Sequence, residues 1–336
     1  MEDHHKSVKI RKQKVKRSVE RIQIKSGKDI PDHALLGKVI FTAGKNYIVV
    51  DENNVEFECI VSGTISTEHG KASVLAVGDN VQFLPPDDER GINYGSVISV
   101  ETRESWLSRK PLIGIREDVL AVNADHLLII MSADNPIYNT RLIDRLLVAA
   151  QIGNLNVSLC INKVDLYDVS MLKKELAHYK KIVDKLFFVS CHKNYGIDEL
   201  VKYLNSKKTI FAGPSGVGKS TVLNKILGYD AQKIQTVSDK WKKGKHTTSS
   251  ARLYKISDDF TIIDTPGIRE FGIVNIDKEE LTLYFREFED CYEHCKFMPC
   301  SHTHEPGCEV KDAVERGKIN FDRYQSYINI YESLKD

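Results

Sequence analysis

The pattern of hydrophobic and polar positions in this chain changes near residue 119. From residue 34 to 102, short runs rich in β-branched and aromatic residues are separated by Gly, Asn, Asp and Pro, as in "KVIFTAG", "NYIVVD", "VEFECIVSG" and "GSVISVE". Closely spaced short strands with turn residues between them are typical of a small closed barrel. The pattern predicts an OB-type barrel over 34–102, with an SH3-like barrel as the alternative. The alternation is lost over 103–118, which we interpret as a linker.

From residue 119 to 276, apolar runs alternate with amphipathic helical segments. The runs "HLLIIMSA", "VSLCIN", "KLFFVS" and "KTIFAG" are separated by segments such as "TRLIDRLLVAAQ" and "IDELVKYLN". Near-continuous apolar strands between helices indicate a mostly parallel sheet covered on both faces, which is an α/β domain. The remaining residues, 277–336, have a helical pattern at both ends and a cluster of Cys and His between them.

A phosphate-binding loop is predicted between one of these strands and the helix after it. The segment "GPSGVGKS" fits G-x-x-x-x-G-K-[ST] in full. Its backbone N–H groups and the helix N-terminus would hold the phosphates, Lys219 would reach the β- and γ-phosphate oxygens, and Ser220 would ligate Mg²⁺. The nucleotide-binding residues expected here are Gly213, Pro214, Ser215, Gly216, Val217, Gly218, Lys219, Ser220 and Thr221.

The segment "IIDTPG" supplies a second part of such a site. Asp264 ends a predicted strand, where its carboxylate would hold Mg²⁺ directly or through water, and the Gly267 N–H would sense the γ-phosphate. Asp264 lies 51 residues after Gly213, a spacing that suits the second switch of a GTPase.

The tetrad "NKVD" at 162–165 predicts that the base is guanine. Asp165 would accept hydrogen bonds from N1–H and the exocyclic amine, Asn162 would bond the O6/N7 edge, and the Lys163 stem would lie over the ring. Adenine lacks that pair of donors, so an ATP complex would leave the carboxylate unpaired. The loop "SCH" follows the next strand, and we expect Ser190 and Cys191 to contact O6 through their backbone.

The order of these motifs is reversed relative to an ordinary GTPase, because the base tetrad precedes the phosphate loop. The contacts with nucleotide lie at the carboxyl ends of strands, so cutting the chain elsewhere and joining the old ends leaves the site intact. The sequence therefore predicts a circularly permuted GTPase domain over residues 119–276. In this order, the Cys/His region directly follows the second switch.

The residue after Gly267 is Ile268, where Ras-like enzymes have the Gln that orients the attacking water. An aliphatic side chain cannot do this, so we expect slow intrinsic hydrolysis. The candidate replacement is His246 in "KKGKHTT", with Thr247 or Thr248 closing on Mg²⁺ and the γ-phosphate and Lys219 stabilising charge. The alternative is that His246 only contacts RNA, since basic loops often bind phosphate.

A structural metal site is predicted in the C-terminal region. Cys295, Cys300, His302 and Cys308 form C-x4-C-x-H-x5-C, a Cys3His set suited to tetrahedral Zn²⁺. Cys291 is the rival fourth ligand, and we expect His294 and His304 to be exposed. The alternative to a metal site is a group of unrelated reduced cysteines that bind no metal.

Composition adds two expectations. The chain of 336 residues is 41% hydrophobic with a net charge of +1, but residues 1–28 carry ten Lys or Arg against three acidic residues. A basic arm over 1–33 would suit a polyanion; a solvated tail or a transit peptide is the alternative. Without an apolar run long enough to span a bilayer, we expect a cytoplasmic monomer that does not contact membranes.

Taken together, the order base tetrad, phosphate loop, "GKHTTS", "DTPGIREF" and "SHTHEPGCEVKDAVERGKI" resembles the bacterial ribosome small-subunit-dependent GTPase A family, the RsgA or YjeQ type. The resemblance covers residues 34–336. It implies an OB domain, a permuted GTPase domain, a zinc domain at 277–336 with the four ligands named above, and a catalytic histidine in the first switch. This chain departs from the family pattern in three small ways. It has "SCH" where "SA" is usual and "HTTS" where "HTTT" is common, and its basic arm is longer than expected.

The family implies a GTPase that assists late maturation of the 30S subunit, contacts 16S rRNA, and is released on hydrolysis. The alternatives are a permuted GTPase acting on the large subunit or another RNA, and an RNA-binding scaffold with a vestigial nucleotide site. Intact Lys219, Ser220, Asp264 and Asp165 argue against the scaffold.

Overall fold

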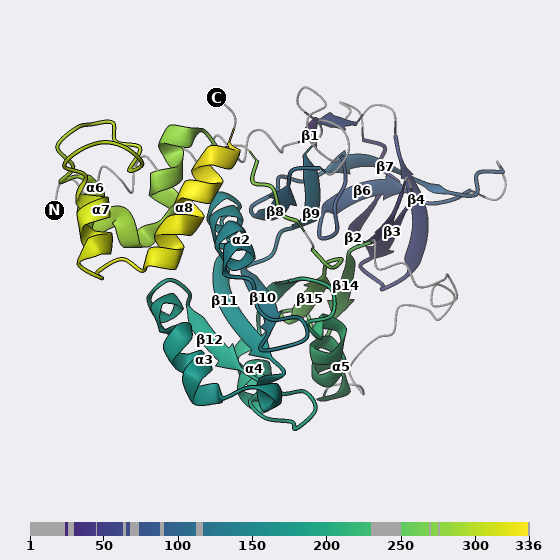
Figure 1. Ribbon diagram of the computed structural model, residues 1–336. Coiled ribbons are helices and arrows are strands. Elements are labelled where there is room, and N and C mark those ends of the chain that lie inside the picture. The colour runs from purple at the N-terminus through teal and green to yellow at the C-terminus, as the bar shows by residue number, and fades with distance from the viewer. Residues whose placement is uncertain are drawn as a thin grey trace.

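The computed structural model describes residues 24–25, 30–44, 46–62, 65–67, 74–87, 91–111, 117–229, 250–268, 270–274 and 276–334. Figure 1 shows three regions, with a barrel and a helical C-terminal region at opposite ends of a central α/β domain. Most of the predicted basic arm, and the candidate residues His246, Thr247 and Thr248, lie outside the described residues.

The N-terminal barrel is built from five strands that close on themselves. They pair in the order β2-β3-β4-β7-β6 and back to β2, and all pairs are antiparallel except β4 with β7. This Greek-key order is that of an OB fold, which decides between the two barrels that the sequence left open. The strands are β2 (Leu35–Ala43), β3 (Asn46–Asp51), β4 (Glu56–Val61), β6 (Asn80–Leu84) and β7 (Gly95–Val100), and a small sheet joins β1 (Ile24–Lys25) to β5 (Ser66–Thr67).

The central domain is a mostly parallel sheet, as the apolar runs predict. Its order is β12-β11-β10-β13-β15-β14, and only β14 runs antiparallel to its neighbour. Alternate residues of each strand enter different cores: Leu127 and Ile129 pack under α2 and α3, whereas Leu128 and Ile130 pack under α4 and α5. The strands are β10 (His126–Ser132), β11 (Asn156–Asn162), β12 (Lys185–Phe188), β13 (Lys208–Ala212), β14 (Arg252–Lys255) and β15 (Thr261–Asp264).

The helices of this domain follow the strands and start where the sequence supplies caps. Asn139 caps α2 (Thr140–Ile152) by accepting from the Leu142 N–H, and Asp168 caps α3 (Val169–Glu175) in the same way. The other helices are α4 (Ile197–Leu204), α5 (Lys219–Tyr229) and the 3-10 turns Val164–Leu166 and Ala177–Lys181. Among the described residues, no helix has the length and apolar character to cross a membrane.

The segment expected to be a linker contains regular structure. Residues Trp106–Arg109 form β8, which pairs with β9 (Asp118–Val122), and Trp106 is 1% exposed. At the start of the segment, Arg103 makes two 2.8 Å hydrogen bonds to the buried Asp79 of the barrel. The sequence did not reveal β8, because a four-residue strand is too short to show alternation and its partner β9 begins only at Asp118.

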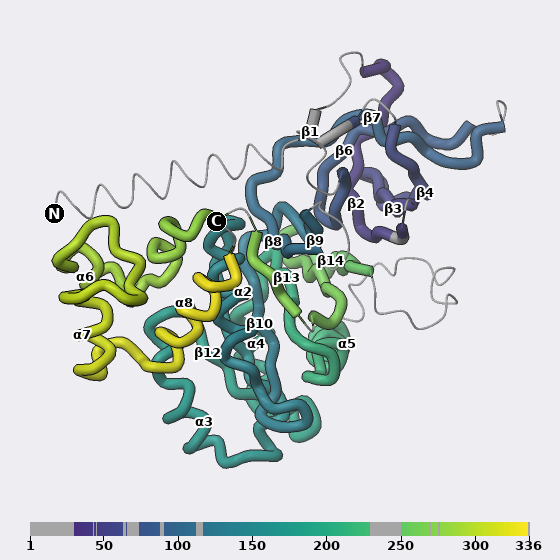
Figure 2. Tube along the Cα trace, turned by 45° about the horizontal axis from the view of Figure 1, so that its top comes forward, coloured from purple at the N-terminus to yellow at the C-terminus, as the bar shows by residue number. Residues whose placement is uncertain are grey.

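The C-terminal region packs its own small core against α2. It contains the 3-10 turns Lys278–Tyr284 and Arg286–Phe288 and the helices α6 (Glu289–Tyr292), α7 (Glu309–Glu315) and α8 (Phe321–Ser333). Its core joins aromatic residues such as Phe285, Phe288 and Tyr327 to Val148 and Ile152 of α2. Figure 2 shows α8 lying along α2 in a second view, so this region is docked on the central domain.

Candidate active site and metal centre

The predicted phosphate loop connects β13 to α5 at the carboxyl end of the sheet. A Cβ on Gly213 would lie 2.0 Å from the Ile130 carbonyl oxygen of β10, so only glycine fits against that strand. Gly218 has φ +93°, and a Cβ there would lie 2.4 Å from the Asn162 amide nitrogen. These glycines are therefore required by close contacts with two other strands, which gives the loop its shape.

Lys219 lies across this loop at the start of α5. Its Nζ donates to the carbonyl oxygens of Gly213 (2.8 Å) and Pro214 (3.2 Å). Burial lowers the pKa of Lys219, while the nearby Asp264 acts in the opposite direction. Next to it, Ser220 and Thr221 are exposed at the helix N-terminus. The loop thus presents an ammonium group and two hydroxyl groups at the position where phosphates would bind.

Asp264 ends β15, one strand away from the phosphate loop, and is held opposite Phe211 by the parallel pairing of β13 and β15. Its Oδ1 is buried and has no hydrogen-bond partner in the part of the chain that is described. Burial raises the pKa of Asp264 to about 6, and Lys219 opposes that rise. A buried carboxylate oxygen without a donor is suited to a hard cation, so the residues present fit Mg²⁺ at this point.

The second switch begins directly after Asp264 and lies against the phosphate loop. A Cβ on Gly267 would lie 3.0 Å from the Ser215 backbone nitrogen, and the Ile268 N–H donates to the Gly213 carbonyl at 3.0 Å. The Ile268 side chain is 1% exposed and belongs to the core of the central domain. It therefore packs into the protein and offers no polar group to a water molecule.

Asn162 of the base tetrad makes hydrogen bonds to the phosphate loop and to the loop after β12. It is 2% exposed; its Nδ2 donates to the Val217 carbonyl (3.0 Å) and its Oδ1 accepts from the Cys191 N–H (3.4 Å). The sequence led us to expect that Asn162 would bond the guanine edge. In the structure its amide links the phosphate loop to the loop after β12, and one amide hydrogen remains for a base.

Asp165 is exposed and is oriented by Ser190. The Ser190 hydroxyl donates to Asp165 Oδ1 and accepts from the Lys193 N–H at 3.1 Å. The hydrogen bond from Ser190 is the main cause that lowers the pKa of Asp165, so the carboxylate stays ionised and ready to accept. Ser190 thus acts here through its side chain, in addition to the backbone role expected from "SCH".

Lys163 lies against a segment that the sequence did not single out. Its Nζ donates to the Gly216 carbonyl (2.7 Å) and to the Asn135 carbonyl, and Pro136 packs beside Gly216. The loop after β10 therefore forms one wall of the phosphate loop. The dipeptide Asn135-Pro136 marked a turn but gave no sign of its neighbour, 81 residues later in the chain.

The four predicted metal ligands come together in the C-terminal region. The ligand atoms of Cys295, Cys300, His302 and Cys308 all lie within 4.8 Å of one another. His302 Nδ1 is 3.4 Å from Cys308 Sγ and 3.6 Å from Cys295 Sγ, and Cys295 Sγ is 3.9 Å from Cys308 Sγ. Burial lowers the pKa of His302 to about 4, which keeps the ring neutral as a metal ligand must be.

The neighbouring Cys and His residues are placed differently. Cys291 is buried in the same core as Cys295 and Cys308 but is not in the group of four, so it is not placed as a ligand. His294 and His304 are exposed, as expected. Three thiols and one imidazole, with three of the four side chains buried, fit a closed tetrahedral zinc site.

The reversed order of the motifs on a parallel sheet, with the phosphate loop, Asp264 and the base tetrad meeting at one edge, defines a circularly permuted P-loop GTPase. The model of the RsgA GTPase family matches residues 100–274, and the chain belongs to that family.

Relatives and solved structures agree with this assignment. The small ribosomal subunit biogenesis GTPase RsgA of Chlorobaculum parvum is 37% identical over 311 residues, which cover 91% of this chain and all of the relative. The protein of the same name from Flavobacterium psychrophilum is 37% identical over 303 residues, 89% of this chain and 93% of its own. The crystal structure of YjeQ from Thermotoga maritima matches with a TM-score of 0.65 and 32% identity, over 90% of this chain and 98% of that one. YloQ, described as a circularly permuted GTPase, matches with a TM-score of 0.62 and 26% identity over 90% and 95% of the two chains.

Proposed function

We propose that this protein is a GTPase of small ribosomal subunit biogenesis, which binds the 30S subunit during its late maturation and leaves it after hydrolysing GTP. The observation that carries the proposal is the single edge of the sheet at which Asp165, Lys219 and Asp264 meet in permuted order. The relatives that carry the name of this activity match almost the whole chain, barrel and C-terminal region included.

Different residues of the site bind the base and the phosphates. Asp165, held by Ser190, accepts the two guanine donors, while Asn162 and Lys163 fix the base pocket to the phosphate loop. Lys219 moves from the loop carbonyls to the β- and γ-phosphates, where its charge is stabilising. Ser220, Asp264 and Thr248 would hold Mg²⁺, which neutralises charge on the phosphate oxygens when it is bound.

Water positioning is assigned to His246. Ile268 is buried and apolar, so the usual place for that function is filled by a core residue. His246 lies in the basic first-switch segment next to Thr247 and Thr248. In this proposal, docking on the subunit orders the segment and brings His246 to the γ-phosphate, as an activating protein does for other GTPases.

Binding to 16S rRNA is assigned to the barrel, the basic arm and the C-terminal region. OB barrels commonly bind oligonucleotides, and the arm carries the excess of Lys and Arg. One Zn²⁺ held by Cys295, Cys300, His302 and Cys308 would stabilise the C-terminal region without taking part in hydrolysis. The protein would act in the cytoplasm as a monomer.

A GTPase assay with isolated ribosomal subunits tests the proposal. We expect slow turnover by the free protein and strong stimulation by 30S subunits, with much less by 50S subunits. Lys219→Ala should lose nucleotide handling, whereas His246→Ala should bind GTP and the 30S subunit but lose most of the stimulated rate. Equal stimulation by 50S subunits would favour a large-subunit factor, and full stimulated activity of His246→Ala would assign water positioning to a ribosomal group.

A further inference from the structure

Glu175, the last residue of α3, joins two loops that border the nucleotide site. Its Oε2 accepts from the hydroxyl of Tyr138, in the loop after β10, and its Oε1 accepts from the Tyr167 hydroxyl at 3.4 Å. Tyr167 stands two residues after Asp165 and ends the 3-10 turn of the base tetrad. One carboxylate therefore contacts both the loop beside the phosphate loop and the turn that carries the predicted guanine acceptor.

The loop that contains Tyr138 is also fixed to the base tetrad and the phosphate loop. The Lys163 Nζ donates to the Asn135 carbonyl and, at 2.7 Å, to the Gly216 carbonyl. Tyr138 is half-buried and packs against the core of the central domain. Burial and the hydrogen bond to Glu175 raise the pKa of Tyr138, so its hydroxyl keeps the proton that it donates. A shift of Tyr138 would therefore move one wall of the phosphate loop.

The turn of the base tetrad depends on α3 for its position on the solvent side. Leu166 is 51% exposed and Tyr167 is 36% exposed, so little of the core surrounds them. Asp168 caps α3 by accepting from the Ser170 N–H at 2.7 Å, and the helix begins at the next residue. A capped helix between Tyr167 and Glu175 acts as a short rigid spacer, which places the carboxylate at a fixed distance from the turn.

We propose that Glu175 is a positioning residue for guanine nucleotides. Through Tyr138 and Tyr167, it keeps the wall of the phosphate loop and the base tetrad at the separation that a bound nucleotide requires. The inference rests on the proposed function, since it takes Asp165 as the acceptor of the guanine donors. Glu175 supplies no group to the phosphate loop, so it acts on the lifetime of the bound nucleotide and not on the chemical step.

The dissociation rate of mant-GDP, chased with excess GDP in the presence of Mg²⁺, tests the assignment. Glu175→Ala and Tyr138→Phe should each raise this rate by about fivefold, as expected for the loss of one hydrogen bond. The variant that combines them should not exceed the larger single effect, because both changes remove the same contact. Tyr167→Phe should have a smaller effect, since its hydrogen bond is long. Glu175→Gln should keep most of the wild-type behaviour, because its amide oxygen still accepts from Tyr138.

Two further measurements separate positioning from a general loss of stability. In the Asp165→Asn background, Glu175→Ala should change the dissociation rate much less than in the wild type, because the base contact that Glu175 positions is already weakened. Single-turnover hydrolysis of bound GTP should keep its rate in Glu175→Ala. Equal effects of Glu175→Ala in the two backgrounds would show that Glu175 acts independently of Asp165 and would contradict the proposal.

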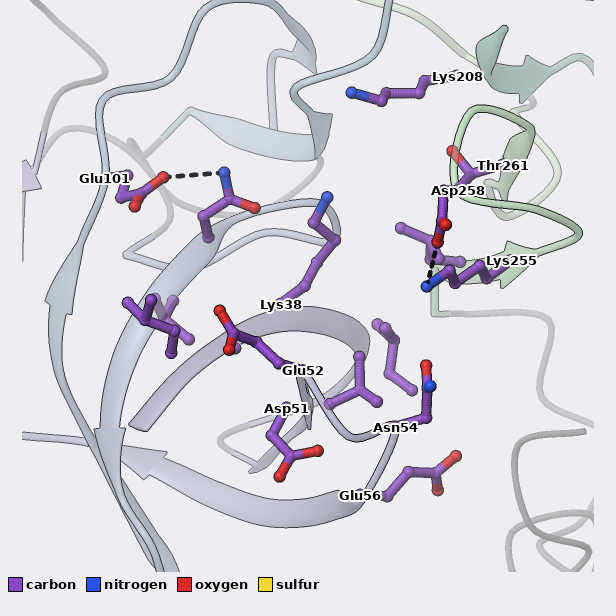
Figure 3. A pocket seen from close by; sticks show the side chains of 17 residues that line it. Lys38, Asp51, Glu52, Asn54, Glu56, Glu101, Lys208, Lys255, Asp258 and Thr261 are labelled. Atoms are coloured by element: carbon purple, nitrogen blue, oxygen red, sulfur yellow. Dashed lines mark hydrogen bonds and ion pairs between the residues drawn. The ribbon is translucent and has the colours of Figure 1, made fainter. Parts of the chain in front are cut away.

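Glu52→Ala is the matched control. It removes an exposed glutamate of the barrel, where Glu52 lines a cavity at the seam between the barrel and the β14–β15 hairpin (Figure 3). Melting curves verify that each variant is folded. Wild-type dissociation rates in both Glu175→Ala and Tyr138→Phe, or an equal acceleration in Glu52→Ala, would overturn the inference alone. A wild-type protein that binds ADP as tightly as GDP would instead overturn the role of the base tetrad in the proposed function.

Discussion

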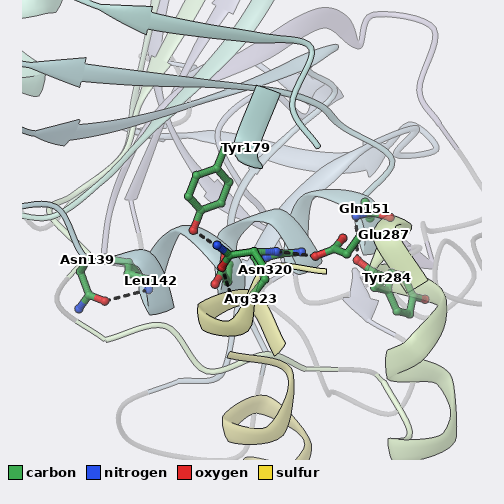
Figure 4. Close-up of polar contacts among 9 residues, drawn as sticks. Asn139, Leu142, Gln151, Tyr179, Tyr284, Glu287, Asn320 and Arg323 are labelled. Carbon is green, nitrogen blue, oxygen red and sulfur yellow. Dashed lines mark hydrogen bonds and ion pairs between the residues drawn. The ribbon is translucent and has the colours of Figure 1, made fainter. Parts of the chain in front are cut away.

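The guanidinium of Arg323 and the carboxylate of Asp144 form an ion pair of 2.6 Å that is almost fully buried between α8 and α2. Asp144 also accepts from the Tyr179 hydroxyl at 2.7 Å, and Arg323 donates to Glu287 at 2.6 Å (Figure 4). The Arg323 guanidinium also lies over the Phe285 ring. One arginine thus connects the C-terminal region to the central domain. That region follows the second switch in the chain.

Removing one partner of this pair should destabilise the protein strongly. We expect Asp144→Asn or Arg323→Met to lower the free energy of unfolding by about 3 to 5 kcal/mol, because a buried charge is left without its partner. Urea titrations followed by circular dichroism would measure the loss. Tyr179→Phe removes a single hydrogen bond and should lower the same free energy by about 1 to 2 kcal/mol.

A double variant, Asp144→Leu with Arg323→Met, compared with Asp144→Leu alone and Arg323→Met alone, distinguishes the charge effect from lost packing. It should be more stable than either single variant, because it leaves neither Asp144 nor Arg323 behind as an unpaired charge. Only Glu287, at the partly exposed end of the network, loses its partner. A double variant whose loss equals the sum of the single losses would show that the two side chains act independently.

Asp264 should make the nucleotide-free protein less stable as pH rises. Its pKa in the folded protein is about 6, above the ordinary value of 3.8, so the folded state holds this proton more tightly than the unfolded chain does. The contribution is complete below pH 3.8 and is lost as pH rises to about 6. Asp264→Asn, which stays neutral, should therefore be more stable than the wild type at pH 7, by about 3 kcal/mol.

The comparison requires denaturation curves of both proteins without Mg²⁺ or nucleotide at pH 4 and pH 7. The difference in free energy of unfolding should be small at pH 4 and large at pH 7. The same variant should lose Mg²⁺-dependent GTP hydrolysis. A difference that does not change between the two pH values would mean that Asp264 is not desolvated as the structure shows.

Asp165 should decide which base is bound. Calorimetry should show binding of GDP and no comparable binding of ADP, and Asp165→Asn should weaken GDP binding by at least about 100-fold, since two donors of the base lose a charged acceptor. The variant should gain affinity for XDP, because xanthine presents a carbonyl where guanine has its amine. Ser190→Ala should weaken GDP binding by less, as it only orients the carboxylate.

Zinc removal should unfold the C-terminal region. Elemental analysis should find about one Zn per chain in protein purified without chelator. Cys300→Ser should reduce that content, whereas Cys291→Ala should keep it because Cys291 lies outside the group of four. Trp106 packs in the same core as this region and reports its loss by fluorescence. Full zinc content in Cys300→Ser together with none in Cys291→Ala would show that Cys291, and not Cys300, is the fourth zinc ligand.

The sequence by itself determined the parts of this protein that depend on neighbours along the chain. The phosphate loop, the base tetrad and the Cys3His spacing are local patterns, and strands β10 to β13 are visible because each contains a nearly continuous apolar run. The order of the motifs was enough to predict the permutation, since the contacts of such a site lie at strand ends. The barrel was predicted as well, although its type was not.

Only the tertiary structure decided which residues meet across long separations. Asn162 contacts Val217, Lys163 contacts Asn135, and Ser190 orients Asp165, yet no spacing in the chain indicates these contacts. The closure of β2 on β6 and the parallel pairing of β4 with β7 chose the OB fold, because strand order is a property of packing. Arg323 and Asp144, 179 residues apart, look like ordinary surface charges until α8 is docked on α2 and water is excluded from both.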